Sequence, residues 1–338
     1  MKSLVFVIIL MVIVACQPSK PLEEKSATNY FLHKNSGIQN GGVKMIPLET
    51  ERGIFNVWTK TIGNNPKTRV LLLSGGPGIS HEYLECFESF LPGEGIEFIY
   101  YDQLGCGHSD NPADTSFWDL DRFVEEVEQV RKSLQLDKDN FYLLGHSWGG
   151  ILAMQYALKY QQNMKGLIVS NMMSSCPDYG QYADEVLALQ MDKVVLDSIR
   201  TMEAAGEYTN PKYMNLLMNH YYQQHICRIL IADWPEPVNR AFAGMNQSLY
   251  VTMQGPSEFG ISGKLTHWDI SKRLQEILIP TLVIGAKHDT MDPEHMKWMS
   301  SQFKNGSYLF CDNGSHMCFY DDQQTYFKGL IDFLNKTK

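Results

Sequence analysis

FYLLGHSWGGILAMQYALKY, residues 141–160, joins a short apolar run to a helical stretch through a glycine-rich turn around Ser147. The turn GHSWG is a G-x-S-x-G pattern, which gains weight when a strand precedes it and a helix follows, as here. Small residues beside the serine permit a tight strand-to-helix turn that exposes the hydroxyl at the carboxyl end of a sheet. The segment therefore predicts a nucleophilic Ser147 near a helix N-terminus, which favours developing negative charge.

Short apolar or β-branched runs recur along the chain and alternate with helical stretches. In residues 117–134 the apolar side chains step by three and four, the pattern of a helix with one buried face. Strands that alternate with helices favour a mostly parallel sheet covered on both faces, an α/β architecture. The eight runs that predict strands are VKMIPL, IFNVWT, RVLLLS, IEFIYY, FYLL, GLIVS, TLVIGA and SYLFC.

One long gap interrupts this alternation. From about residue 176 to 264 the chain is rich in Met, Tyr and helical patterns and poor in strand signals, whereas both flanks continue the alternating scheme. We therefore predict a helical cap at 176–264, inserted into an α/β core made of residues 41–175 and 265–338.

A serine hydroxyl is a weak nucleophile until a base removes its proton. The hypothesis therefore requires a carboxylate and a histidine after the serine, in the order Ser, Asp, His. Asp289 follows the run TLVIGA and His316 follows SYLFC, and the carboxyl ends of such strands are where α/β sheets place their chemistry. Asp292 and Asp312 are rivals to Asp289, which we prefer because it directly follows its strand.

Attack by the serine creates a negative oxygen that needs two preorganised donors. We expect the backbone N–H of Trp148, directly after the nucleophile, to be one of them. The loop SGGPGISHEYL after the third predicted strand should supply the other, because its glycines permit close backbone approach, and Gly76 is the expected donor. This chemistry needs no metal or other cofactor, and no CxxC or His/Cys cluster indicates zinc.

The composition and net charge of the chain limit the classes of ligand that it can attract. The 338 residues are 44% hydrophobic and 20% charged, as in ordinary globular enzymes, and the formal net charge is −9. Without a basic stripe the chain lacks long-range attraction to phosphates, so we expect a small or peptidic ligand and no nucleic acid. Six cysteines follow residue 16 at irregular spacing, which leaves disulfides and free buried thiols both open.

The first residues, MKSLVFVIILMVIVACQPSK, contain an apolar stretch that is short for a membrane span and reads as a signal peptide. The residues before Cys16 resemble a bacterial lipobox, which predicts a signal peptide at 1–15, lipid on Cys16 and a polar tether at 16–40. The alternative is an uncleaved anchor or a plain signal with a chance cysteine. We expect an exported lipoprotein that touches the membrane only through its lipid, with the outer membrane preferred.

Several segments match one family pattern: SGGPGISHEYL, YYDQLGCGHSD, GHSWGG, YTNPKYM, HYYQQHICR, DWPEPV, MQGPSEFGISGKLTHWDIS and the Asp289 and His316 loops. From about residue 41 to the C-terminus the chain resembles the proline iminopeptidases, most closely the branch typified by the archaeal tricorn-interacting aminopeptidase. The resemblance implies an α/β-hydrolase fold with a mostly parallel eight-stranded sheet. It also implies a serine aminopeptidase that releases an N-terminal residue, proline or another, from short peptides with a free N-terminus.

The resemblance also assigns substrate-binding residues. Glu258, in GPSEF, stands where the family's amine-binding glutamate stands, and Tyr250 and Tyr83 match positions that shape the same pocket. A carboxylate in a partly dry site holds a protonated amine by a charge-assisted hydrogen bond. The archaeal branch has a second amine-binding glutamate after the catalytic aspartate, but that position is Thr290 here. This departure puts the proline preference in doubt unless another acid, such as Asp292, compensates.

Two other functions stay open at this point. A carboxylesterase or amidase of the same fold would carry the same triad, because the elbow specifies acyl chemistry and not the acyl group. A lipid-anchored protein that binds peptides without turnover would use the tether and the cap, but it has no need of a complete Ser, Asp and His set.

Overall fold

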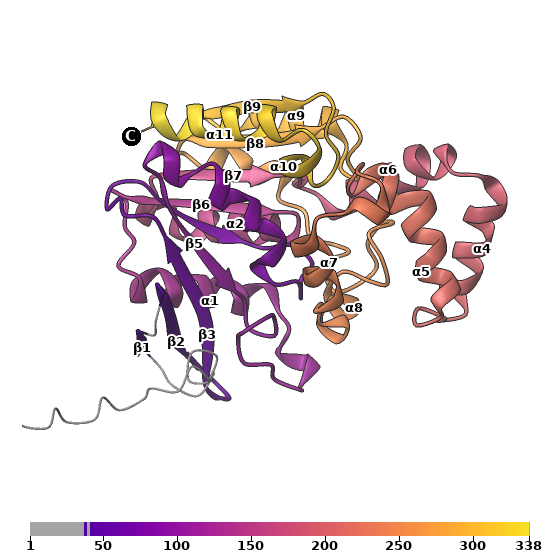
Figure 1. The fold of residues 1–338 in the computed structure, drawn as a ribbon, viewed down its shortest axis with the longest axis horizontal. Helices are drawn as coiled ribbons and strands as arrows, with labels where there is room; N and C mark the ends of the chain where they lie inside the picture. The colour runs from indigo at the N-terminus through magenta and orange to yellow at the C-terminus, as the bar shows by residue number, and fades with distance from the viewer. Residues whose placement is uncertain (1–36, 39–40, 338) are drawn as a thin grey trace, which may run out of the picture. The chain divides into compact units, whose positions relative to one another are not determined.

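The structure, a computed structural model, describes residues 37–38 and 41–337, and every structural statement below concerns these residues. Figure 1 shows a twisted sheet with helices on both of its faces. The strands are β1 (Gly37–Ile38), β2 (Val43–Thr50), β3 (Gly53–Ile62), β4 (Arg69–Leu73), β5 (Glu97–Asp102), β6 (Phe141–His146), β7 (Gly166–Ser170), β8 (Thr281–Ala286) and β9 (Gly306–Cys311). The α-helices are α1 (Leu120–Ser133), α2 (Trp148–Tyr160), α3 (Cys176–Tyr182), α4 (Lys193–Ala204), α5 (Pro211–Leu217), α6 (Gln223–His225), α7 (Glu236–Ala243), α8 (Gln247–Met253), α9 (Pro293–Gln302), α10 (Cys318–Asp321) and α11 (Gln323–Lys336).

The strand order across the sheet is β1-β2-β3-β5-β4-β6-β7-β8-β9. Neighbouring strands from β5 to β9 run parallel, and β1, β2 and β3 form an antiparallel edge. The predicted α/β architecture is confirmed, and the eight predicted strands correspond to β2 to β9. β1 adds a two-residue pairing with Lys44 and Met45, inside the segment predicted as a tether.

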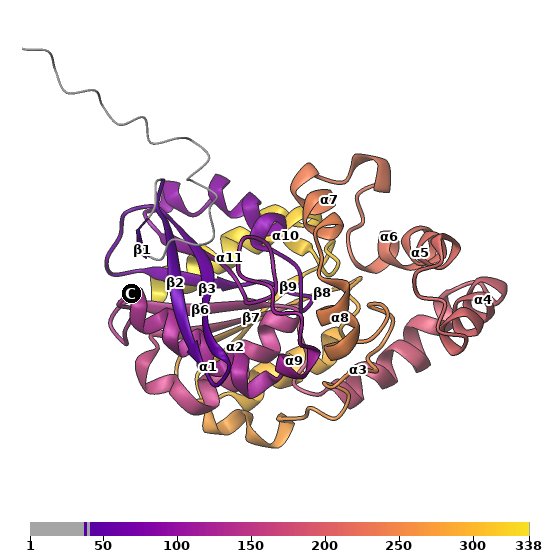
Figure 2. The ribbon, with the colours of Figure 1, turned by 90° about the horizontal axis from the view of Figure 1, so that it is seen from below.

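Apolar side chains hold a layer of helices on each face of the sheet. α1, α2 and α9 contribute to the main core on one face, and α11 lies on the opposite face (Figure 2). There the 3₁₀ helix His81–Ser89 packs against α11, with the ring centroids of Phe87 and Phe327 5.0 Å apart. β6 and β7 are buried along their whole length, as expected for parallel strands covered on both faces.

Between β7 and β8, a stretch that includes the segment predicted as a cap, the chain forms helices and loops, and an isolated β-bridge joins Ser175 to Asp269. α3 begins at Cys176 because the Ser175 side chain accepts the Asp178 N–H and so caps the helix. α4 to α8 lie beside the sheet (Figure 1). Arg240 of α7 forms ion pairs of 3.0 Å with Glu82 and Glu85, which connects this helical segment to the 3₁₀ helix of the core.

Six cysteines lie in the described part of the chain, and all are free thiols; five are buried and Cys86 is half-buried. The predicted signal peptide at 1–15, the lipidated Cys16 and most of the tether at 16–40 lie outside the described residues. Among the helices of the described residues, none combines the length and the apolar character that a membrane span requires.

Candidate active site

Ser147 lies on a sharp turn between the end of β6 and the start of α2. Its backbone has φ +56° and ψ −127°, a conformation that costs free energy for a residue with a side chain. The neighbouring glycines leave no room for a side chain. A Cβ on Gly145 would overlap the carbonyl of Gly149, and a Cβ on Gly149 would overlap the carbonyl of Leu73. The turn is held by the Ser147 N–H, which donates to Ser170 O at 3.0 Å.

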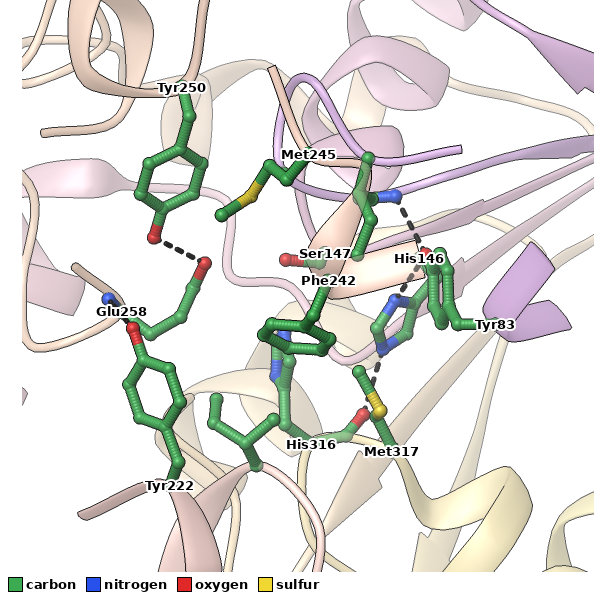
Figure 3. A pocket seen from close by; sticks show the side chains of 14 residues that line it. Tyr83, His146, Ser147, Tyr222, Phe242, Met245, Tyr250, Glu258, His316 and Met317 are labelled. Atoms are coloured by element: carbon green, nitrogen blue, oxygen red, sulfur yellow. Dashed lines mark hydrogen bonds between the residues drawn. The ribbon is translucent and has the colours of Figure 1, made fainter. Parts of the chain in front are cut away.

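Asp289 and His316 meet beside this turn, although 27 positions separate them in the chain. His316 Nδ1 lies 2.7 Å from Asp289 Oδ1, and both side chains are buried. The Asp289 carboxylate can only accept, so Nδ1 donates and Nε2 is free to act as a base. Nε2 is buried without a hydrogen-bond partner in the described chain, and His316 and Ser147 line the same pocket (Figure 3).

The charge environment favours a protonated His316. Burial opposes the imidazolium ion, but the charge and hydrogen bond of Asp289, together with the charge of Glu258, outweigh burial and raise the pKa of His316. A base with a raised pKa accepts a proton more readily, provided that it is neutral at the working pH.

The two rival carboxylates have other contacts. Asp292 caps α9, where its Oδ1 accepts the Glu294 N–H at 2.9 Å. Asp312 is exposed and pairs with Lys287 at 3.3 Å. Of the three candidates, the structure brings only Asp289 to His316.

The two expected oxyanion donors lie on either side of Ser147. Trp148 is the first residue of α2, so its N–H has no acceptor within the helix. Gly76 lines the pocket at φ +98°, in the loop that follows β4. This loop packs closely on the serine, because a Cβ on the adjacent Gly75 would lie 3.0 Å from Ser147 Cβ.

Gln103 connects this glycine-rich loop to the turn, a role that no sequence pattern described above indicates. Its Oε1 accepts from Trp148 Nε1 at 2.8 Å, and its Nε2 donates to Ser74 O at 3.1 Å. The signal was available in the segment YYDQLGCGHSD, where a buried glutamine follows a strand end.

Tyr83 and His146 form a second connection. The Gly75 N–H donates to Tyr83 Oη at 2.7 Å, and Tyr83 Oη lies 2.9 Å from His146 Nδ1. His146 Nε2 lies 2.8 Å from His316 O, so Nε2 donates and Nδ1 accepts from Tyr83. Burial, then the charge of His316, lowers the pKa of His146, and burial raises the pKa of Tyr83. Both groups are therefore neutral, and their hydrogen bonds join the loops around Ser147.

Glu258 lies across the pocket, half-buried, on the loop after α8 (Figure 3). Tyr250 Oη donates to its Oε1 at 2.6 Å, and the Glu258 N–H donates to Tyr222 Oη at 3.2 Å. Its carbonyl accepts from Tyr179 at 2.6 Å and from Tyr221 at 3.2 Å. Loss of hydration raises the pKa of Glu258, although the charge of His316 and the Tyr250 hydrogen bond oppose this.

The pocket is a hollow of about 410 Å³, a volume that includes space open to solvent, and its walls are mainly apolar and aromatic. It is lined by Gly75, Gly76, Ile79, Tyr83, His146, Ser147, Tyr222, Ile226, Phe242, Met245, Tyr250, Glu258, His316 and Met317. Glu258 is the sole carboxylate among these lining residues, so Asp292 does not provide a second one. Thr290 is buried with its Oγ1 3.2 Å from His316 Nδ1. Within the described chain, no cluster of three or more His, Cys, Asp or Glu side chains is placed to hold a metal ion.

Known proteins resemble the chain over this whole region. Residues 68–323 match the family model described as alpha/beta hydrolase fold. A proline iminopeptidase of Flavobacterium johnsoniae is 59% identical over 291 residues, which are 86% of this chain and 97% of that protein. A proline iminopeptidase of Saccharolobus solfataricus is 37% identical over 284 residues, 83% of this chain and 90% of that protein. The crystal structure of the Mycobacterium smegmatis proline iminopeptidase covers 87% of this chain and 98% of its own, with a TM-score of 0.76 and 25% identity. The chain therefore belongs to the proline iminopeptidase family, within the α/β-hydrolase fold.

Proposed function

We propose that this protein is a serine aminopeptidase that releases N-terminal proline from short peptides with a free N-terminus. The observation that carries the proposal is the Glu258 carboxylate, which faces the pocket of Ser147 and His316 from the opposite wall (Figure 3). A carboxylate there binds the protonated amine of an N-terminal residue and so places the first peptide carbonyl at the serine. The proline iminopeptidase relatives support the choice of proline.

In the proposed acylation step, His316 takes the proton of Ser147 while Asp289 holds the imidazole in the tautomer protonated at Nδ1. Ser147 Oγ attacks the first peptide carbonyl, and the N–H groups of Gly76 and Trp148 stabilise the negative oxygen. His316 then gives its proton to the nitrogen of the leaving peptide. The product is a prolyl ester of Ser147 and a peptide shortened by one residue.

Deacylation repeats the same proton transfers with water as the nucleophile. His316 removes a proton from water, the hydroxide attacks the ester carbonyl, and the returned proton releases Ser147. Free proline leaves the pocket. These steps use side chains and backbone amides of this chain alone.

The pocket walls suit a small ring. Ile79, Phe242 and Met245 provide apolar contacts, and Tyr250 holds one oxygen of Glu258 and leaves the other for the substrate. A pyrrolidine ring buries its methylene groups against such walls while its ammonium group faces the carboxylate. Thr290 is buried against His316, so we infer that a single carboxylate, that of Glu258, binds the amine. On its sequence motifs, we assign the chain to the branch similar to the tricorn-interacting aminopeptidase.

We also infer that the protein is an exported lipoprotein. The support is the sequence before Cys16, which reads as a signal peptide at 1–15 with a lipobox, followed by the polar tether at 16–40. Lipid on Cys16 would hold the enzyme at the membrane, by preference the outer one, with membrane contact through the lipid only. Growth with radiolabelled palmitate tests this, because label should enter the wild-type protein and not Cys16→Ala.

A steady-state assay tests the enzymatic proposal. The substrates are prolyl and alanyl anilides, their N-acetylated forms and p-nitrophenyl acetate, and the variants are Ser147→Ala and Glu258→Gln. Free-amine prolyl anilide should be cleaved, the acetylated form should not, and Glu258→Gln should lose activity on the anilide alone. If the ester is the single substrate and Glu258→Gln changes nothing, the protein is instead an esterase of the same fold. If Ser147 does not react with a fluorophosphonate, the protein binds peptides without turnover.

A further inference from the structure

Asn171 is a buried residue directly after β7 that the proposed mechanism does not use. Its side chain is fully buried and its backbone has φ +54°, the left-handed region that few residues other than glycine and asparagine enter readily. Its N–H donates to Ile284 O of β8 at 2.8 Å, which holds the residue at the carboxyl ends of two neighbouring strands. This position is where an α/β sheet carries its reactive groups.

The amide of Asn171 reaches both loops of the acid and base pair. Nδ2 donates to Asp289 Oδ2 at 2.7 Å and to Ser315 O at 3.3 Å. Oδ1 accepts from Cys318 Sγ at 3.4 Å. Ser315 and Cys318 flank His316, so one side chain contacts the carboxylate of Asp289 and the chain on both sides of the histidine.

The hydroxyl groups of Ser170 and Tyr326 determine which way the side-chain amide of Asn171 faces. Ser170 Oγ donates to Asn171 Oδ1 at 2.7 Å and receives a hydrogen bond from Tyr326 Oη at 3.2 Å. With Oδ1 occupied by donors, the NH₂ group must face Asp289. An aspartate of the same size at this position would accept only, and it would place a second negative charge against Asp289.

The two oxygens of Asp289 therefore have separate contacts. Oδ1 accepts from His316 Nδ1 at 2.7 Å and from the Met291 N–H at 3.2 Å, and Oδ2 accepts from Asn171. Without the second contact, only the contacts on Oδ1 would oppose rotation of the carboxylate about its terminal torsion, which has a broad energy minimum. Rotation would loosen the imidazole that Asp289 orients.

We propose that Asn171 is a positioning residue for catalysis, which fixes the Asp289 carboxylate and the His316 loop relative to each other without touching the substrate. The inference rests on the proposed function, because it assumes that His316 acts as the base for Ser147. In metal sites, hydrogen-bond partners behind the ligands typically contribute about ten- to a hundredfold to metal affinity or activity, because they orient the ligands, and we expect an effect of the same order here.

The test compares Asn171→Gly, Ser170→Ala and the control Gln135→Gly. Glycine keeps the positive φ without strain and removes the amide, and Ser170→Ala removes a donor that orients the amide. Gln135 is an exposed polar residue at φ +55°, so its change to glycine repeats the backbone effect away from the site. Active sites are titrated with a fluorophosphonate, so that kcat on prolyl anilide refers to folded enzyme only.

We expect Asn171→Gly to lower kcat per titrated site by about ten- to a hundredfold, with KM within about twofold of the wild type. Ser170→Ala should lower kcat by a smaller factor, and Gln135→Gly should match the wild type. An unchanged kcat per site in Asn171→Gly, or a change in KM alone, would overturn the proposal. If Asn171→Gly does not fold, Ser170→Ala tests the proposal in its place. A wild-type kcat per titrated site in Ser170→Ala would then overturn the proposal.

The rate of Ser147 labelling by the fluorophosphonate separates this inference from the proposed function. Labelling depends on the base that activates Ser147 and not on recognition of a peptide. If the wild type is labelled but does not cleave prolyl anilide, the peptide assignment fails, and slower labelling of Asn171→Gly still supports the positioning role. Equal labelling rates in the two proteins would reject that role.

Discussion

His146 Nε2 donates to the carbonyl oxygen of His316 at 2.8 Å, so the residue before the nucleophile holds the backbone of the base. The two residues are 170 positions apart in the chain. They meet because the order of strands in the sheet places the loops after β6 and β9 within reach of each other. Through Tyr83, the same imidazole also contacts the glycine-rich loop. The three loops around the pocket therefore depend on one buried, neutral ring.

Tyr83→Phe should lower both stability and activity. The change leaves the Gly75 N–H and His146 Nδ1 without a partner, and a buried unsatisfied polar group costs about 1–3 kcal/mol. Urea unfolding should show this loss of free energy, together with a lower kcat. Tyr142→Phe, which removes a hydrogen bond to Thr337 O far from the pocket, is the control for kcat and should keep the wild-type value. A wild-type free energy of unfolding in Tyr83→Phe would contradict the network.

Substitutions at Ser147 should separate activity from stability. Ser147→Ala and Ser147→Gly should each lower kcat by about 10⁴-fold or more, because the nucleophile is lost. Ser147→Gly should also unfold at a higher denaturant concentration than the wild type and Ser147→Ala. Glycine adopts φ +56° without the cost of about 1 kcal/mol or more that a residue with a side chain bears there. Equilibrium unfolding of both variants measures the difference. Equal stability of the glycine and alanine variants would show that the turn is not strained.

Glu258→Gln should act on substrates with a charged amine. A hydrogen bond between charged groups contributes about 1.5–3 kcal/mol, so kcat/KM on prolyl anilide should fall by about ten- to a hundredfold. Hydrolysis of p-nitrophenyl acetate, which has no amine, should be nearly unchanged at a pH above the acidic limb of the His316 titration. Glu128→Gln is the matched control, because the Glu128 carboxylate also accepts from a tyrosine, Tyr156 at 2.7 Å, but lies on α1. Equal losses on both substrates would contradict amine recognition by Glu258.

The pH dependence of kcat/KM should have an acidic limb above the ordinary histidine pKa of about 6.5. His316 must be neutral to act as a base, so activity falls as the pH drops through its raised pKa. In Glu258→Gln the limb should move to lower pH, because the Glu258 charge helps to raise the pKa of His316. A pH–rate profile of both proteins with p-nitrophenyl acetate measures this, and a limb that moves to higher pH would contradict it.

Stability should respond to His316 in the opposite direction. A pKa that is raised in the folded state means that protonated His316 stabilises the fold below its unfolded-state pKa. This contribution is lost as the pH rises through the folded-state pKa, where activity appears. Urea unfolding of the wild type and His316→Gln across this range should show the stability difference shrinking with rising pH. A difference that grows with pH would refute the assignment.

The sequence by itself determined the strands β2 to β9 and the glycines of the turn at Ser147. It also predicted the chain order of Ser147, Asp289 and His316, because short-range patterns and strand ends specify these features. The contacts of Asn171 with Asp289, of His146 with His316 and of Gln103 with Trp148 were decided by the tertiary structure alone. So were the free thiols and the contacts of Tyr179, Tyr221 and Tyr222 with Glu258, whereas the family resemblance had already placed Tyr250 in that pocket. Each of these contacts depends on how loops from different strands meet at one edge of the sheet, and no local pattern of residues encodes that meeting.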